Sequence, residues 1–193
     1  MYKFRKLLLP LFFAGLAVAT LSASATPVVF NFDADTVGTQ NSSDTVSGLT
    51  LTYLGAAAVC DTTGLGFTSL SGNALATYAC NSDYGSAILR FSSPLSSLSY
   101  DYALDYTDPV GVLYLLDGQF AGTGSLTGDA NGEGSQTFTR PFDEVLFDTG
   151  SSDSDYALDN LSAVVATPEP SSIALLGTGM LGFVGLVRRR FKV

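Results

Sequence analysis

The chain has 193 residues, of which 46% are hydrophobic and 14% are charged, with a formal net charge of −9 and no histidine. Seven of the nine basic residues lie near the two ends, so residues 26–166 hold only Arg90 and Arg140 against 17 acidic side chains. This excess of negative charge makes nucleic acid and anionic lipid surfaces poor partners for the region. Its carboxylates either attract divalent cations or simply keep a lysine-free domain soluble.

The N-terminal segment has the pattern of a secretory signal peptide. Lys3, Arg5 and Lys6 precede an apolar stretch over residues 7–19, and Ala23 and Ala25 supply a small-residue cleavage site. We predict a signal peptide helix over residues 1–25, removed by signal peptidase after Ala25, with Ala19 or Ala23 as alternative scissile positions. An uncleaved anchor is the alternative, although the apolar stretch is shorter than the ~20 residues that a span needs.

Residues 26–166 are predicted to form one domain, because about 140 residues suffice for a single core. Apolar residues alternate with polar ones, as in Leu49, Leu51 and Tyr53, which is the period of half-buried strands. Strands bounded by Gly, Pro, Asp or Ser are expected over residues 28–32, 49–53, 86–91, 98–106, 110–116, 142–147 and 156–165. Short strands in this number predict an all-β fold, an antiparallel β-sandwich.

Cys60 and Cys80 are the only cysteines, and both belong to the part of the chain that would enter an oxidising compartment. We predict a disulfide between them. In the chain-entropy model, closing a loop of about 20 residues stabilises a domain by roughly 3 kcal/mol. Two thiols without histidine fall short of the four ligands that zinc usually takes.

The segment 118–134 is rich in glycine and is either a mobile loop or a turn-rich hairpin at a sheet edge. Within it, Asp129, Asn131 and Glu133 match the opening of a calcium loop of the EF-hand kind. The match fails at position twelve, where Arg140 stands in place of a bidentate glutamate. The loop from Asp148 to Asp155 also gathers carboxylates, which we interpret as a solvated turn.

The opening segment 29–33 and the segments 142–147 and 155–161 together resemble jelly-roll domains related to carbohydrate-binding modules. The resemblance implies that the first and last strands lie side by side. It would bring Asp33 near Asp159 and Asn160, whose oxygens suit a structural calcium ion. The alternative is that Asp159 and Asn160 form only a bulge or an Asx turn.

Catalytic signatures are absent from this sequence. A chain without histidine cannot assemble a Ser-His-Asp or Cys-His relay, so an enzyme is not expected. A glycoside hydrolase with paired carboxylates is the least favoured alternative. For sugar binding, Tyr78, Tyr84 and Tyr106 lie near turn-like sequence and are candidate platforms, although each is more often a residue at the rim of a core.

The last 27 residues, 167–193, have three parts: Pro168-Glu169-Pro170, a mainly apolar segment over 171–187, and a basic end at 188–193 that contains Arg188, Arg189 and Arg190. The apolar part reaches the lower length limit of a transmembrane helix. Arginines after such a helix keep its C-terminal end on the cytoplasmic side. This arrangement closely resembles the PEP-CTERM protein-sorting signal of Gram-negative bacteria. The resemblance implies processing near Pro168-Glu169-Pro170 by an exosortase.

Together these features predict a protein that is exported across the inner membrane, held there as a precursor and delivered to the cell envelope or the extracellular space. We expect a structural or adhesive role in an exopolysaccharide or biofilm matrix, with exopolysaccharide as a partner. The alternative is a calcium-dependent carbohydrate-binding module. No cofactor is expected apart from the structural calcium ion that the jelly-roll resemblance would allow at Asp33, Asp159 and Asn160.

Overall fold

The computed structural model describes residues 25–77, 85–104, 109–128, 132–148, 155–167 and 179, and its described domain is all-β. This confirms the fold class expected from the alternating apolar pattern. The strands are β1 (Val28–Phe30), β2 (Gln40–Val46), β3 (Leu49–Asp61), β4 (Asn73–Ala76), β5 (Ala87–Leu104), β6 (Val110–Leu116), β7 (Gln119–Leu126), β8 (Glu133–Phe138), β9 (Phe142–Asp148) and β10 (Tyr156–Val165).

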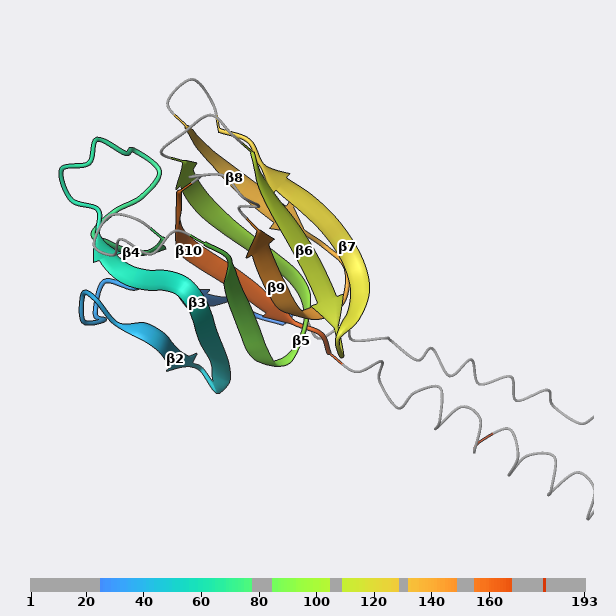
Figure 1. Cartoon of the computed structure of the whole chain (residues 1–193). Helices are drawn as coiled ribbons and strands as arrows, with labels where there is room; N and C mark the ends of the chain where they lie inside the picture. The colour runs from blue at the N-terminus through green and yellow to red at the C-terminus, as the bar shows by residue number, and fades with distance from the viewer. Residues whose placement is uncertain are drawn as a thin grey trace, which may run out of the picture.

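Every pairing between these strands is antiparallel, and the strands form two layers (Figure 1). The two longest strands, β3 and β5, run through both layers. The first sheet has the order β2, β3, β5, β9, β6, β7, and it uses the first parts of β3 and β5. The second sheet contains β1, β10, β8 and the last part of β5, with β4 joining β10 to the end of β3. The fold is therefore a β-sandwich whose layers share two bent strands.

β5 joins two strands that the sequence separates. Pro94 lies between them and lacks an N–H to donate, and the pairing of β5 with β9 shifts register between Arg90 and Leu95. The expected break is thus a bend at which one continuous strand passes from the first sheet to the second. The first and last strands pair directly, with Phe30 opposite Leu161, as the jelly-roll resemblance implies.

Two hairpins of the first sheet close through two-residue turns with positive φ at both positions. These turns are Ser47-Gly48 between β2 and β3, and Asp117-Gly118 between β6 and β7. Positive φ at both central residues is typical of type I′ turns, whose twist matches that of the paired strands. The glycine-rich segment accordingly contains a strand at the edge of the sheet, β7, which agrees with the hairpin alternative.

The main core lies between the two sheets and is rich in aromatic rings. Phe138 of β8 stacks on Tyr114 of β6 at a centroid distance of 3.7 Å, and Tyr100 of β5 packs edge-on against Phe147 of β9. A second, smaller cluster lies on the outer side of the second sheet and consists mainly of small residues, including Ala58, Ala74 and Ala157. The loop 62–72 contributes Leu70 and Phe67 to this cluster and so covers it.

Several predictions fall on residues outside the described ranges: most of the signal peptide, the segment 168–170, the predicted transmembrane helix and the terminal arginines. Among the described residues, no helix is long and apolar enough to cross a membrane. Cys60 is fully buried at the end of β3, and the described residues include no free cysteine. Because Cys80 lies outside them, its pairing with Cys60 stays a prediction.

Candidate functional site

A buried carboxylate on the second sheet holds the loop 62–72 in place. Glu133, the first residue of β8, is only 8% exposed, and its oxygens accept hydrogen bonds from the amide of Thr68 at 2.8 Å, the hydroxyl of Thr68 at 2.6 Å and the amide of Ser69 at 2.9 Å. The bonds from Thr68 lower the pKa of Glu133 below its usual value. The residue that resembled a calcium ligand therefore binds backbone and hydroxyl groups of this chain.

Two further carboxylates attach the end of the same loop. Asp159 of β10 accepts the Ser71 amide at 3.2 Å, and Asp33 accepts the Asn73 amide at 3.0 Å. Asp159 is 1% exposed, and burial raises its pKa, an effect to which the charges of Asp33 and Asp101 add. Carboxylates from three distant parts of the chain thus hold one loop by its amides.

These contacts bear on the predicted calcium site. Both oxygens of Asp159 accept amide hydrogens, the second from Asn160 at 2.7 Å, and the amide of the Asn160 side chain donates to Asp101 at 3.1 Å. Asn160 also lies at a register shift of β10 with φ of 52°, which agrees with the bulge alternative. In the described part of the chain, no three acidic or cysteine side chains are arranged to hold a metal ion. Calcium binding stays a prediction that this hydrogen bonding does not favour.

The outer face of the first sheet is different in character. Pairing places four aliphatic side chains side by side across β3, β5, β9 and β6, because directly opposed residues point to the same face. We call them the aliphatic row: Leu54, Ile88, Leu146 and Leu113. Each is half-buried, whereas the inward row beside them, which contains Leu89 and Val145, is fully buried.

A polar row runs parallel to the aliphatic row on this face. It consists of the polar residues Thr52, Arg90 and Glu144 and ends at the apolar Leu115, each paired with the next across the same four strands. Arg90 donates to Glu144 at 2.6 Å, and this is the one ion pair among the described residues. The two charges at the centre of the face therefore compensate each other, in contrast to the second sheet with Asp101, Asp159 and Glu133.

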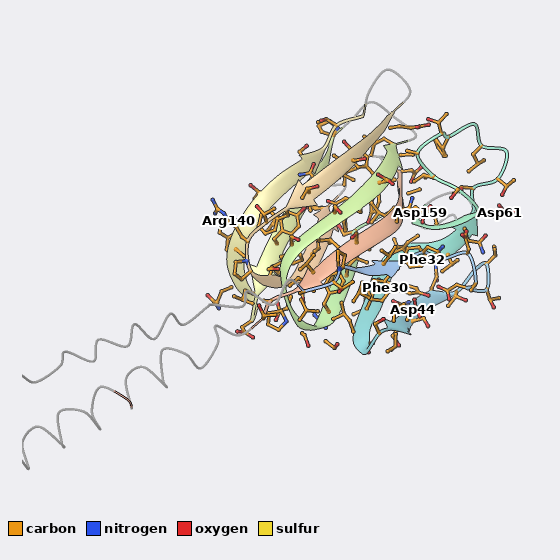
Figure 2. All side chains as sticks on the ribbon, turned by 180° about the vertical axis from the view of Figure 1, so that it is seen from behind. Phe30, Phe32, Asp44, Asp61, Arg140 and Asp159 are labelled. Carbon is orange, nitrogen blue, oxygen red and sulfur yellow. The ribbon has the colours of Figure 1, made fainter. Side chains whose placement is uncertain are left out.

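A shallow hollow of about 510 Å³ lies at one end of the sandwich, beside the turn between β6 and β7. We call it the end hollow; it is lined by Leu116, Asp117, Gln119, Phe120, Ala121, Arg140 and Pro141. The Phe120 side chain is 68% exposed, the largest exposed fraction of any large apolar residue that the structure describes. Figure 2 shows Arg140 and Asp61 at opposite ends of the sandwich.

The residues predicted for sorting, cleavage and sugar binding are mostly outside the described ranges. These are Pro168, Glu169, Pro170, Arg188, Arg189, Arg190, Ala23, Tyr78, Tyr84 and Tyr106, while Ala25 is the first described residue. The aliphatic row has no contiguous signal in the sequence, because its members come from four separate strands. Phe120 was hidden in the glycine-rich segment, where a single aromatic residue among small ones was the only signal.

Two solved structures have a similar arrangement of strands at low sequence identity. One is a mutant of CBM29-2, a family 29 carbohydrate-binding module, with 17% identity, coverage of 72% of this chain and 90% of that chain, and a TM-score of 0.42. The other is a carbohydrate-binding module of family 29, with 16% identity, coverage of 77% and 97%, and a TM-score of 0.42. No curated protein matches the chain.

The sequence profile of the PEP-CTERM protein-sorting motif matches residues 166–190. The chain carries a PEP-CTERM sorting motif. The motif confirms the tail resemblance drawn from Pro168-Glu169-Pro170 and the basic end, and it marks an exported protein. It begins at Ala166, immediately after β10 ends at Val165, so the sorting motif and the sandwich adjoin without a linker domain between them.

Proposed function

We propose that the exported sandwich is a structural or adhesive component of an extracellular polysaccharide matrix, and that it contacts neutral polysaccharide through the outer face of the first sheet. The precursor is held in the inner membrane by its tail and released by an exosortase that acts near Pro168-Glu169-Pro170. The observation that carries the proposed contact is the aliphatic row beside the compensated Arg90–Glu144 pair.

The chemistry of the face supports a neutral sugar chain. Apolar side chains that lie in a row and are each partly exposed form a candidate interaction surface, since water leaves them when a partner covers them. A pyranose ring presents C–H groups on its faces and hydroxyls at its rim, so it can cover the aliphatic row while its hydroxyls reach Thr52, Arg90 and Glu144. A polyanionic sugar is disfavoured, because residues 26–166 carry 17 acidic side chains and two arginines.

Co-sedimentation of the processed domain with an insoluble neutral glucan tests this proposal. We expect Leu113→Ser with Leu146→Ser to weaken binding about tenfold, because losing ~1.4 kcal/mol of apolar contact corresponds to that factor. Val37→Ser is the matched control, since Val37 is 47% exposed but lies outside this face. Thermal melting of each variant shows whether it remains folded.

Equal binding by the double variant and the control would contradict the proposed face, and absence of binding by the unchanged domain would contradict the adhesive role. Repeating the titration with calcium and with a chelator tests the calcium-dependent alternative. We expect the same affinity in both solutions. Loss of binding on chelation would favour a calcium-dependent carbohydrate-binding module, with Asp33, Asp159 and Asn160 as the candidate calcium ligands.

A further inference from the structure

The end hollow lies at the end of the sandwich from which the chain leaves toward its sorting motif. Leu95 of β5 pairs with Phe142 on one side and with Val165 on the other, and Ala166 donates to the Pro94 carbonyl at 2.9 Å. Pro141 precedes Phe142 directly. Since neighbouring strands are about 4.8 Å apart, the hollow begins roughly 10 Å from the last residues of β10.

The chain beyond the domain keeps this end near a membrane while the tail is attached. Five residues, 168–172, separate Thr167 from the apolar run that begins at Ile173. At no more than ~3.5 Å a residue, they span at most about 20 Å. As long as the tail is inserted, the end hollow is therefore close to the headgroups, whereas the loop 62–72 is at the far end of the sandwich.

The side chains of the hollow suit a phospholipid surface. Arg140 forms no ion pair with any residue that the structure describes, and the exposed ring of Phe120 lines the same hollow. An aromatic ring partitions into the interfacial region of a bilayer, and a guanidinium binds phosphate oxygens in a forked geometry. Asp117, in the same hollow, offers a carboxylate to an ammonium group.

We propose that the end hollow docks on zwitterionic phospholipid headgroups while the precursor is anchored. Phe120 enters the interface, Arg140 binds the lipid phosphate and Asp117 faces the lipid ammonium. The net negative charge of the domain opposes an anionic surface, so the mixed charges of the hollow fit a headgroup that carries both signs. This inference depends on the anchoring tail and is independent of the proposed sugar face.

The chain contains no tryptophan, so a single introduced one reports its own surroundings. We would reconstitute full-length Phe120→Trp and, separately, Leu65→Trp into vesicles of phosphatidylcholine and phosphatidylethanolamine. Leu65 is 50% exposed and lies in the loop at the opposite end, which makes it the matched control. Emission wavelength, acrylamide quenching and vesicle flotation are measured for each.

We expect tryptophan at position 120 to emit at shorter wavelength and to lose quenching by acrylamide, while tryptophan at position 65 keeps the signal of an exposed residue. Adding Arg140→Gln to Phe120→Trp should reverse much of the change, and anionic lipid should not enhance it. Water-like emission at position 120 in chains that float with the vesicles would overturn the proposal. Chains that do not float would overturn it too, since docking requires the anchor.

Discussion

Two carboxylates that hold the loop 62–72, Glu133 and Asp159, have opposite electrostatic environments. Glu133 accepts three hydrogen bonds from the loop 62–72, and they lower its pKa, whereas burial raises the pKa of Asp159. A lowered pKa means that the ionised group stabilises the fold, and a raised pKa means that ionisation costs stability. The same loop is thus held by one carboxylate whose surroundings favour its ionised form and by another whose surroundings oppose ionisation.

Urea unfolding across pH tests this contrast at the residue scale. The contribution of Glu133 is fully present above its usual pKa of 4.5 and is lost as pH falls through its lowered folded value. The stability lost in Glu133→Gln should therefore be largest near neutral pH and shrink in acid. Asp159→Asn should do the opposite: relative to it, the unchanged protein gains stability as acid protonates Asp159.

Tyrosine fluorescence or circular dichroism follows each unfolding transition. The two variants control for each other, because the stability lost in each should change with pH in opposite directions. Parallel pH profiles for Glu133→Gln and Asp159→Asn would contradict the opposite pKa shifts assigned to the two carboxylates.

The loop contacts of Glu133 could not be predicted from the sequence, because its partner Thr68 is 65 positions away. Local spacing could only group Glu133 with its neighbours Asp129 and Asn131.

At the scale of elements, the glycines of β7 allow the second sheet to pack directly on the backbone of the first. A Cβ atom built at Gly122 would lie 2.8 Å from the ring of Phe138, which is stacked on Tyr114. A Cβ atom at Gly124 would similarly lie 3.1 Å from the side chain of Gln136. The glycine-rich composition therefore serves close approach between β7 and β8.

We predict that Gly122→Ala destabilises the domain by about 1–3 kcal/mol, because the added methyl group displaces a ring from a packed core. Gly111→Ala is the matched control in the neighbouring strand, since its Cβ atom would lie 3.5 Å from the Asp148 carbonyl oxygen, an ordinary contact. Denaturant melts of the two variants measure the difference. Equal stability of both variants would show that Phe138 does not depend on this approach.

The alternating pattern predicted the strands that have one apolar face, such as the start of β3 with Leu49, Leu51 and Tyr53. It missed β2 because the sequence of that edge strand, Gln40–Val46, is almost wholly polar, and it missed β4 because four residues are too short to show a period. Both depend on pairing with β3, which is a tertiary effect. The continuity of β5 through Pro94 likewise depends on its neighbours.

At the scale of the whole molecule, the two sheets divide the chemistry between them. The second sheet carries the acidic residues Asp101, Asp159 and Glu133 and is partly covered by the loop 62–72. The first sheet leaves the aliphatic row uncovered beside one compensated ion pair. The delivery signal was readable from sequence because its parts are contiguous, whereas the face was not, since it exists only once four strands are in register.

The most direct test of the central claim is an NMR titration of the processed domain with a soluble neutral oligosaccharide. We predict that the largest methyl and amide shifts occur at Leu54, Ile88, Leu113 and Leu146, with smaller ones at Thr52 and Arg90. Shifts confined to other parts of the domain, or none at saturating oligosaccharide, would contradict the assignment of the first sheet as the adhesive face.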